Sequence, residues 1–289
     1  MNMNGTIKVD LLTGLWADGV CSRTALLRPI TGEEEAFLLE AGTSMFPAQW
    51  VTALLARCLV SPEAQDHVKE DTARSFCIGD REALLLHLRR LTFGDRMQSI
   101  LACPFPECKE KMDLDLNVRD LLLRPYSQNG EWHNARLNDN GHVYDVRFRL
   151  PTGADQEAVS GLAQTDLNAA SSMLLRNCIG GIAREDGSTV EVIPQSLETQ
   201  LSSLMSELDP QAELILNMIC PACSKNFSVI FDTASYLSKE MASHMEHIYR
   251  EVHMLAFYYH WSESDIMAMT QKKRERYLDL LDETLKGWR

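Results

Sequence analysis

Two close pairs of cysteines limit what this chain of 289 residues can fold into. Cys103 and Cys108 flank a turn that contains two prolines, and Cys220 and Cys223 flank a shorter turn with one proline. Alternating apolar residues follow each pair, which is the pattern of a half-buried β-strand. Each pair therefore predicts a cysteine knuckle, meaning a tight turn that presents two thiols and leads into a strand.

The spacing within each pair suits a metal ion. Two cysteines separated by two to four residues can present both sulfur atoms to one ion, and structural zinc takes four such ligands. We expect Cys103, Cys108, Cys220 and Cys223 to meet in space and bind one structural zinc ion per chain, in a zinc-ribbon-like site. Two alternatives stay open, namely reduced thiols that line a core and a redox pair at Cys220 and Cys223. A redox pair should open a helix, whereas a strand is expected here.

The sequence around the two pairs contains a weak internal repeat. Residues 29–35 and 151–157 are both proline-containing turns followed by acidic residues. Residues 54–58 and 174–178 are both Leu-containing segments that end in cysteine. These segments occur in the same order, and at nearly the same separation, as the two knuckles. We expect two similar halves related by a pseudo-two-fold axis, with coincidence among common helix starts as the alternative explanation.

Between these segments the apolar residues recur with the period of a helix. Residues 80–91 and 197–208 each carry a stripe of four leucines. The predicted fold class is α+β and mostly helical, with two pseudo-repeated helical halves that each end in a knuckle and a strand. The expected parts are a first half (1–124), a linker or hairpin loop (125–142), a second half (143–234) and a C-terminal helical hairpin (235–289).

The C-terminal part has the clearest helical pattern. Residues 237–260 are expected to form one helix with a heptad seam, and Ser262 begins a capping box that starts a second helix. The seam is too short for a free coiled coil, so it packs either on the protein's own body or on one partner helix. The residues predicted for a partner interface are Met241, Met245, Ile248, Val252, Leu255, Tyr259 and Trp261.

Two other clusters in this part are interpreted as ordinary helix surface. His244, His247, His253 and His260 lie one or two helical turns apart, but no carboxylate completes a ligand set, which disfavours a second metal site. The basic cluster 272–276 contains a glutamate and precedes further acidic residues. A solvated face is therefore favoured over nucleic-acid binding.

Charge and motifs exclude several classes of function. The net charge of −13, from 28 basic and 41 acidic residues, disfavours binding to nucleic acid and to anionic membranes. No apolar run has the length of a membrane span, and the first residues lack the pattern of a signal peptide, so a cytoplasmic protein is expected. The common nucleophile, phosphate-binding, dinucleotide and zinc-protease motifs do not occur. We expect no enzyme, no catalytic residue and no small-molecule substrate.

The run from Glu251 to Ile266, followed by Arg276 to Leu281, resembles the C-terminal signature of the base-plate protein family of T-even-like bacteriophages and phage-derived contractile systems. Residues 27–32 and the two knuckles are similar to larger members of this family. The resemblance implies a non-enzymatic component or assembly factor of a contractile-tail base plate or its hub. It implies other base-plate or hub proteins as partners, in the bacterial host cell or in an assembled tail particle. The expected zinc rests on the cysteines alone.

Two other functions are compatible with the cysteine pairs. A zinc-ribbon adaptor that binds nucleic acid or the transcription machinery needs a basic surface beside the knuckles, but Glu107, Asp113, Asp115 and Asp232 make this region acidic. A metal-dependent enzyme needs an open coordination position and a pocket. We favour a base-plate protein that acts through protein contacts and is stabilised by structural zinc.

Overall fold

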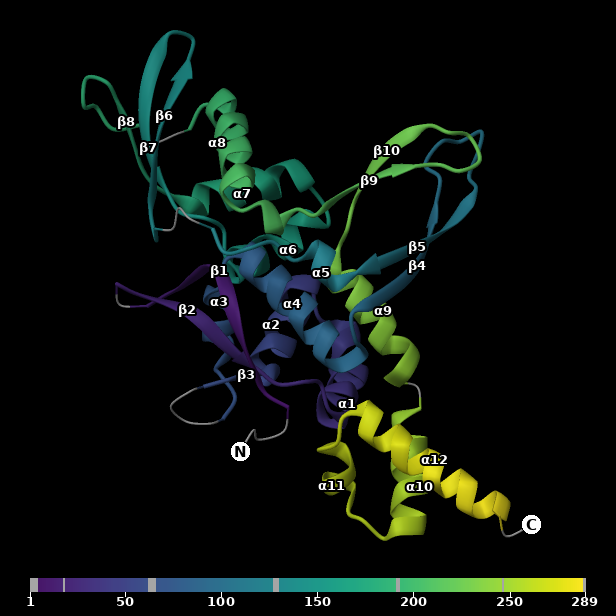
Figure 1. Ribbon diagram of the computed structural model, residues 1–289. Coiled ribbons are helices and arrows are strands. Elements are labelled where there is room, and N and C mark those ends of the chain that lie inside the picture. Colours follow the sequence, from purple (N-terminus) through teal and green to yellow (C-terminus); the bar gives the residue numbers. More distant parts are fainter. Residues whose placement is uncertain are drawn as a thin grey trace.

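The protein has a mixed α/β structure, about 50% helical and 26% strand. Figure 1 shows two groups of helices and strands, two long hairpins that project to one side, and a helical C-terminal part below them. None of the helices in the described ranges combines the length and the apolar composition needed to cross a membrane. The computed structural model describes residues 5–17, 19–61, 66–126, 130–190, 193–245 and 247–287.

The first half contains a three-stranded antiparallel sheet, several helices and a long hairpin. Its elements are β1 (Ile7–Ala17), β2 (Val20–Leu27), α1 (Gly32–Ala41), α2 (Pro47–Cys58), β3 (Leu59–Val60), α3 (Glu70–Ser75), α4 (Ile78–Phe93), β4 (Arg96–Ala102), β5 (Lys111–Asn117) and α5 (Val118–Leu121). The sheet has the order β1-β2-β3. Leu54, Leu55 and Leu85 are fully buried, so α2 and α4 form the centre of the core.

The expected second half, taken together with β6 from the linker segment and with α9, has the same order of elements as the first half except that it lacks a helix in the place of α3. Its elements are β6 (His133–Asp139), β7 (His142–Phe148), α6 (Gly153–Ala163), α7 (Leu167–Cys178), β8 (Ile179–Arg184), α8 (Gln195–Leu208), β9 (Ile215–Ile219), β10 (Asn226–Ile230) and α9 (Thr233–Met245). Its sheet has the order β6-β7-β8. The segment expected as a linker or hairpin loop contributes β6 and a tight turn in which Asn140 and Gly141 have φ of 50° and 83°, as two-residue hairpin turns require.

Similar ion pairs lie at the starts of α1 and α6. Arg28 pairs with Glu34 at 2.8 Å, and Arg149 pairs with Asp155 at 2.6 Å. Each carboxylate also accepts a hydrogen bond from the threonine that caps its helix. Burial raises the pKa of both carboxyls and is the largest single influence. The hydrogen bond and charge of the arginine, together with the hydrogen bonds from the capping threonine, outweigh it and leave the pKa of Glu34 and Asp155 below the ordinary values.

The strands that follow α2 and α7 are also attached in the same way. The Arg28 N–H donates to the Cys58 carbonyl at 3.0 Å, and the Arg149 N–H donates to the Cys178 carbonyl at 2.9 Å. Both cysteines are fully buried, and burial raises the pKa of the Cys178 thiol to about 12. These two lone cysteines are therefore unreactive parts of the core.

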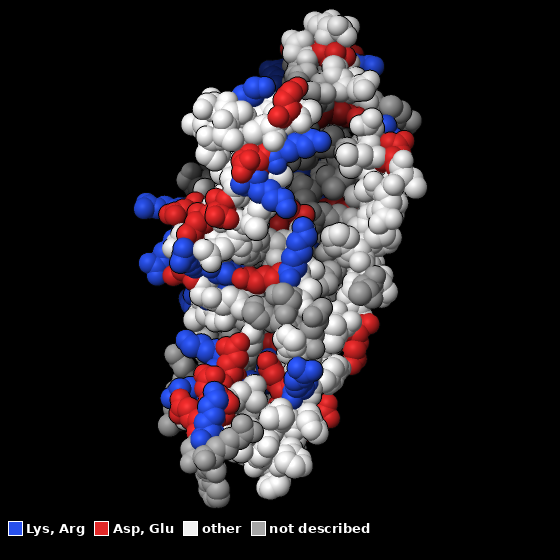
Figure 2. All heavy atoms as spheres, turned by 90° about the vertical axis from the view of Figure 1, so that its right-hand side faces the viewer, with Lys and Arg blue, Asp and Glu red and all other residues white. Residues whose placement is uncertain are grey.

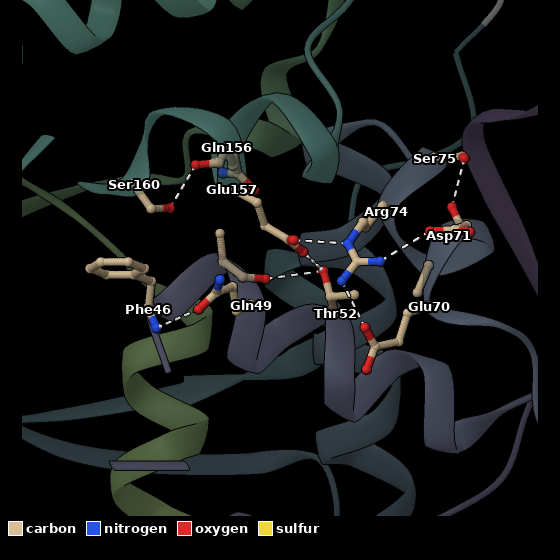
Figure 3. Close-up of polar contacts among 12 residues, drawn as sticks. Phe46, Gln49, Thr52, Glu70, Asp71, Arg74, Ser75, Gln156, Glu157 and Ser160 are labelled. Atoms are coloured by element: carbon tan, nitrogen blue, oxygen red, sulfur yellow. Dashed lines mark hydrogen bonds and ion pairs between the residues drawn. The ribbon is translucent and has the colours of Figure 1, made fainter. Parts of the chain in front are cut away.

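A polar cluster joins the two halves (Figure 3). Glu157 on α6 accepts a hydrogen bond from Thr52 on α2 and pairs with Arg74 on α3 at 2.8 Å. Arg74 also pairs with Glu70 and Asp71, at 2.7 and 3.0 Å. A carboxylate of the second half is thus shared by two helices of the first half, which fixes the position of α6 on α2 and α3.

The C-terminal part is not a simple helical hairpin. After α9 the chain forms α10 (Ile248–Tyr259), α11 (Glu263–Met267) and α12 (Gln271–Gly287). The expectation of one helix over 237–260 is wrong because its apolar residues belong to two cores. Leu237 and Met241 pack in the first-half core, whereas Ile248 packs in a separate core with α11 and α12.

The helix expected from Ser262 onward is interrupted as well. Ser262 caps α11 by accepting the Asp265 N–H, but the chain turns before α12. At this turn the Met269 carbonyl accepts hydrogen bonds from the Gly32 N–H at 3.1 Å and from Arg274 Nη1 at 2.8 Å. The interruption therefore attaches the C-terminal part to the start of α1.

Candidate metal centre

The two hairpins place the cysteines at their turns. Cys103 follows β4 and Cys108 precedes β5, while Cys220 and Cys223 lie in the turn between β9 and β10. Figure 1 shows the two turns together at the same side of the molecule. The knuckles were predicted from local spacing, and the fold brings them together from distant parts of the sequence.

The four sulfur atoms form one compact group. All lie within 4.8 Å of one another. The Cys103 and Cys223 sulfurs are 3.8 Å apart, and the Cys108 and Cys220 sulfurs are 3.7 Å apart. A tetrahedral ion with metal–sulfur bonds of about 2.3 Å separates its ligands by about 3.8 Å. The group can therefore hold a metal ion with little movement, and each hairpin supplies two of its ligand atoms.

Backbone hydrogen bonds close both turns in a similar way. The Cys103 N–H donates to the Glu110 carbonyl at 2.8 Å, and the Cys220 N–H donates to the Lys225 carbonyl at 3.1 Å. The residue after the second cysteine of each pair has a left-handed backbone: Lys109 with φ 52° and Ser224 with φ 56°. This reversal lets the strand return while both sulfur atoms stay on one side of the turn.

The environment favours negative charge on one sulfur in particular. The backbone N–H of Cys223, helped by that of Ala222, lowers the pKa of the Cys220 thiol to about 7. Burial raises the pKa of the Cys103 thiol to about 12. Because a bound cation deprotonates coordinating thiols, the whole group can carry thiolate charge once an ion lies among the four sulfurs.

Apolar side chains surround the sulfur atoms. Met112 and Phe227, on the inner faces of the two hairpins, pack against the cysteines. The Phe105 and Phe227 rings meet edge to face with centroids 6.5 Å apart, and the Lys225 ammonium lies 4.7 Å from the Phe105 centroid. This layer limits access of water to the buried Cys103 and Cys220, while Cys108 and Cys223 are partly exposed.

The chain matches the family model described as T4 bacteriophage base plate protein over residues 19–238. This protein belongs to that family. The match covers both knuckles and residues 27–32, whereas the run 251–281, which carried part of the resemblance in the sequence, lies outside it. Comparison with curated proteins and with solved structures gives no match.

Most of the residues predicted as a partner interface lie inside this base-plate family protein. Met241, Ile248, Val252 and Leu255 are buried, and Tyr259 and Trp261 stack on each other with centroids 4.7 Å apart. The side chain of Met245 lies outside the described residues. The structure therefore corresponds to the alternative in which the seam packs on the protein's own body.

One residue of the basic cluster 272–276 is buried, contrary to the expectation from the sequence. Arg274 is only 1% exposed and pairs with Glu35 at 2.5 Å and with Glu251 at 2.8 Å. The interpretation of this cluster as a solvated face is wrong for Arg274, because its two acidic partners come from α1 and α10. Both partners lie far from Arg274 in the sequence, so no local sequence pattern predicts them.

Among the described residues, the four cysteines form the only group of three or more potential metal ligands.

Proposed function

We propose that this protein is a non-enzymatic structural or assembly protein of the base plate or hub of a phage-like contractile tail. It acts through contacts with other base-plate or hub proteins, and one zinc ion stabilises it. Family membership supports the base-plate role. The observation that carries the rest is the meeting of four sulfur atoms from two separate hairpins, all within 4.8 Å.

Zinc is the proposed ion because the donor set consists of four thiolates. A compact four-sulfur set suits zinc or an iron–sulfur centre, and paired knuckles at this spacing are typical of structural zinc. Four protein ligands leave no coordination position for water, so the ion contributes to folding rather than to catalysis.

We also propose that the two halves are repeats of one ancestral unit. The support is the common order of elements, the same strand order in both sheets, and the equivalent pairs Arg28–Glu34 and Arg149–Asp155. A pseudo-two-fold relation explains why equivalent knuckles face each other at one ion.

The nucleic-acid adaptor is not favoured. Basic and acidic residues alternate on the hairpin turns, where Lys225 pairs with Glu107 at 3.9 Å. On β4 and β5 the exposed Arg96 pairs with the exposed Asp115 at 2.6 Å. Neither arrangement forms the single-sign basic surface that phosphate backbones need.

Metal analysis of protein purified without a metal-affinity tag tests the zinc site. The wild type should contain one zinc per chain, and Cys103→Ser and Cys220→Ser should each lose it, because each removes a ligand from a different hairpin. Cys21→Ser is the matched control, since Cys21 lies outside the group. Absence of zinc from the wild type, or its loss from only one of the two variants, contradicts a shared site.

The base-plate role is tested separately. Deletion of the gene should block assembly of complete base plates, and the wild-type protein supplied in trans should restore them. Normal tails in the deletion strain contradict the proposal. Detection of the protein in purified particles distinguishes a lasting component from an assembly factor.

A further inference from the structure

The two cysteine hairpins leave strand edges unpaired. Each hairpin is a sheet of only two strands, β4 with β5 and β9 with β10. The bond from the Cys103 N–H to the Glu110 carbonyl fixes the ladder of the first hairpin, and the bond from the Cys220 N–H to the Lys225 carbonyl fixes that of the second. Because hydrogen-bonded and non-hydrogen-bonded pairs alternate in antiparallel sheets, these two bonds identify the backbone groups that point away from each hairpin.

On β4, the backbone groups of Gln98 and Ile100 point outward. The Tyr236 hydroxyl accepts the Gln98 N–H and donates to the Gln98 carbonyl, both at 3.1 Å. The side chain of Tyr236 thus takes the place of a neighbouring strand at one position. Within the described chain, the backbone N–H and carbonyl of Ile100, two residues further along, make no hydrogen bond.

On β10, the corresponding outward groups belong to Ser228 and Ile230. They also make no backbone hydrogen bond among the described residues. The β4 and β10 strands border one cleft of about 540 Å³, which has consecutive residues of both strands along its walls and Leu114, Leu216 and Tyr236 among its lining. Its volume falls within the range of ligand-binding clefts, about 300–1,000 Å³.

Natural proteins usually protect a free strand edge with charged residues or proline. The β5 strand follows this rule, because Lys111, Asp113 and Asp115 are exposed along it. The β9 and β10 strands contain no charged residue and no proline. At the cleft, Ile100 is 68% exposed and Ile230 is 60% exposed.

We infer that an extended, uncharged segment of a neighbouring base-plate protein binds in this cleft as an added β-strand between β4 and β10. This inference rests on the proposed function, since it specifies how the partner is held. Outward N–H and carbonyl groups that recur every second residue match the main chain of an extended peptide, and the apolar floor accepts alternate side chains. Charge is confined to the α9 end of the cleft, at Asp232, Lys239 and Glu240, so the central part fits an uncharged segment.

The test measures binding of purified base-plate proteins from the same tail to the zinc-loaded full-length chain. Each base-plate protein is tested singly. For the protein that binds the wild type, Ile230→Pro should weaken affinity by at least about tenfold, equivalent to 1.4 kcal/mol, because proline removes an outward N–H. Ile230→Val keeps this N–H and should bind nearly as the wild type does. Asp113→Pro is the matched control, since its N–H also points outward but lies on the charged β5 edge.

Amide hydrogen exchange gives a second measurement that does not depend on proline. Exchange at Ile100 and Ile230 should slow at least about tenfold in the complex, because paired amides are protected, while exchange at Asp113 should not change. Equal affinities of Ile230→Pro and Asp113→Pro, together with unchanged exchange at Ile100 and Ile230, overturn the inference while leaving the proposed function intact. Self-association of the wild type that Ile230→Pro abolishes also overturns it, because the occupant is then a second copy. If the wild type binds no base-plate protein and the deletion strain makes normal tails, the proposed function fails too.

Discussion

The two cysteine hairpins share one backbone plan but have different outer faces. Near the turns, the inner faces of both hairpins carry apolar residues that pack around the same four cysteines. The outer face of β4–β5 carries charged residues, including the Arg96–Asp115 pair. The outer positions of β9–β10 are all uncharged, namely Ile215, Asn217, Ile219, Asn226, Ser228 and Ile230. Packing around the four sulfur atoms constrains the inner faces of both hairpins, whereas the outer faces do not share this constraint and can differ in charge.

Charged residues are also unevenly distributed over the side of the molecule on which the hairpins project. Figure 2 views the molecule from the side on which the hairpins project, and it shows charged side chains gathered along one margin and a largely uncharged opposite margin. The ion pairs at the starts of α1 and α6 differ in how deeply they are buried. The side chains of Arg28 and Glu34 are 14% and 1% exposed, against 27% and 7% for Arg149 and Asp155. The ion pair of the first half is therefore the more deeply buried of the two.

Removal of the metal is expected to have the largest effect, and it should affect both hairpins equally. Structural zinc contributes directly to folding free energy, so a strong chelator should lower the free energy of unfolding by several kcal/mol. Hydrogen exchange should then rise in β4–β5 and in β9–β10 together. If hydrogen exchange rises in only one hairpin, the two hairpins do not share one ion.

Breaking each of the two ion pairs should destabilise the protein by different amounts, because the pairs differ in burial. Arg28→Ala leaves the buried Glu34 carboxylate without its partner and should cost about 3 kcal/mol, whereas the more exposed Arg149→Ala should cost about 1–2 kcal/mol. Urea unfolding of both variants measures the difference. Equal costs would show that the difference in exposure has no energetic consequence.

Acidification should also weaken the two ion pairs, with a smaller effect on the free energy of unfolding than the substitutions have. The folded-state pKa of Glu34 and of Asp155 lies below the ordinary values of 4.5 and 3.8. Their stabilisation is thus fully present above those values and is lost as the pH falls through the lowered pKa values. Between about pH 5 and pH 3 the wild type should lose more stability than Arg28→Ala, by about 1 kcal/mol. Parallel acid curves for the two proteins contradict this assignment.

The outer face of β9–β10 should be nearly neutral for folding. Ile219 is 66% exposed, so Ile219→Thr should change the free energy of unfolding by no more than about 0.5 kcal/mol. Asp115→Asn on the other hairpin is the comparison. A decrease of about 2 kcal/mol or more in the free energy of unfolding, as for a buried side chain, would show that Ile219 contributes to folding. The face would then not be available to a partner.

Features that depend on neighbouring residues could be predicted from the sequence. The knuckles follow from the spacing of Cys103 with Cys108 and of Cys220 with Cys223, and the leucine stripes correspond to α4 and α8. Features that depend on distant residues could not be predicted in this way. The break between α9 and α10 arises because one apolar seam serves two cores.

The candidate sites also differ in whether they depend on neighbouring or on distant residues. Local spacing identified four cysteines as a group, and the fold supplied the distances that make a metal ion geometrically reasonable. The burial of Arg274 depends on Glu35 and Glu251, which lie far from it in the sequence. The cleft between β4 and β10 depends on how two hairpins face each other, and no single segment of sequence carries that information.

Because the four cysteines come from distant parts of the sequence, they become available at different times during synthesis. The first two cysteines emerge from the ribosome well before Cys220 and Cys223, so the first half alone can offer an ion only two thiolates. Four thiolates become available only after residue 223 has been made and β9–β10 has folded against β4–β5. A metal ion that needs all four thiolates would therefore be bound only after both hairpins have been made, and a truncated product that ends before the second knuckle could not hold it with a full ligand set.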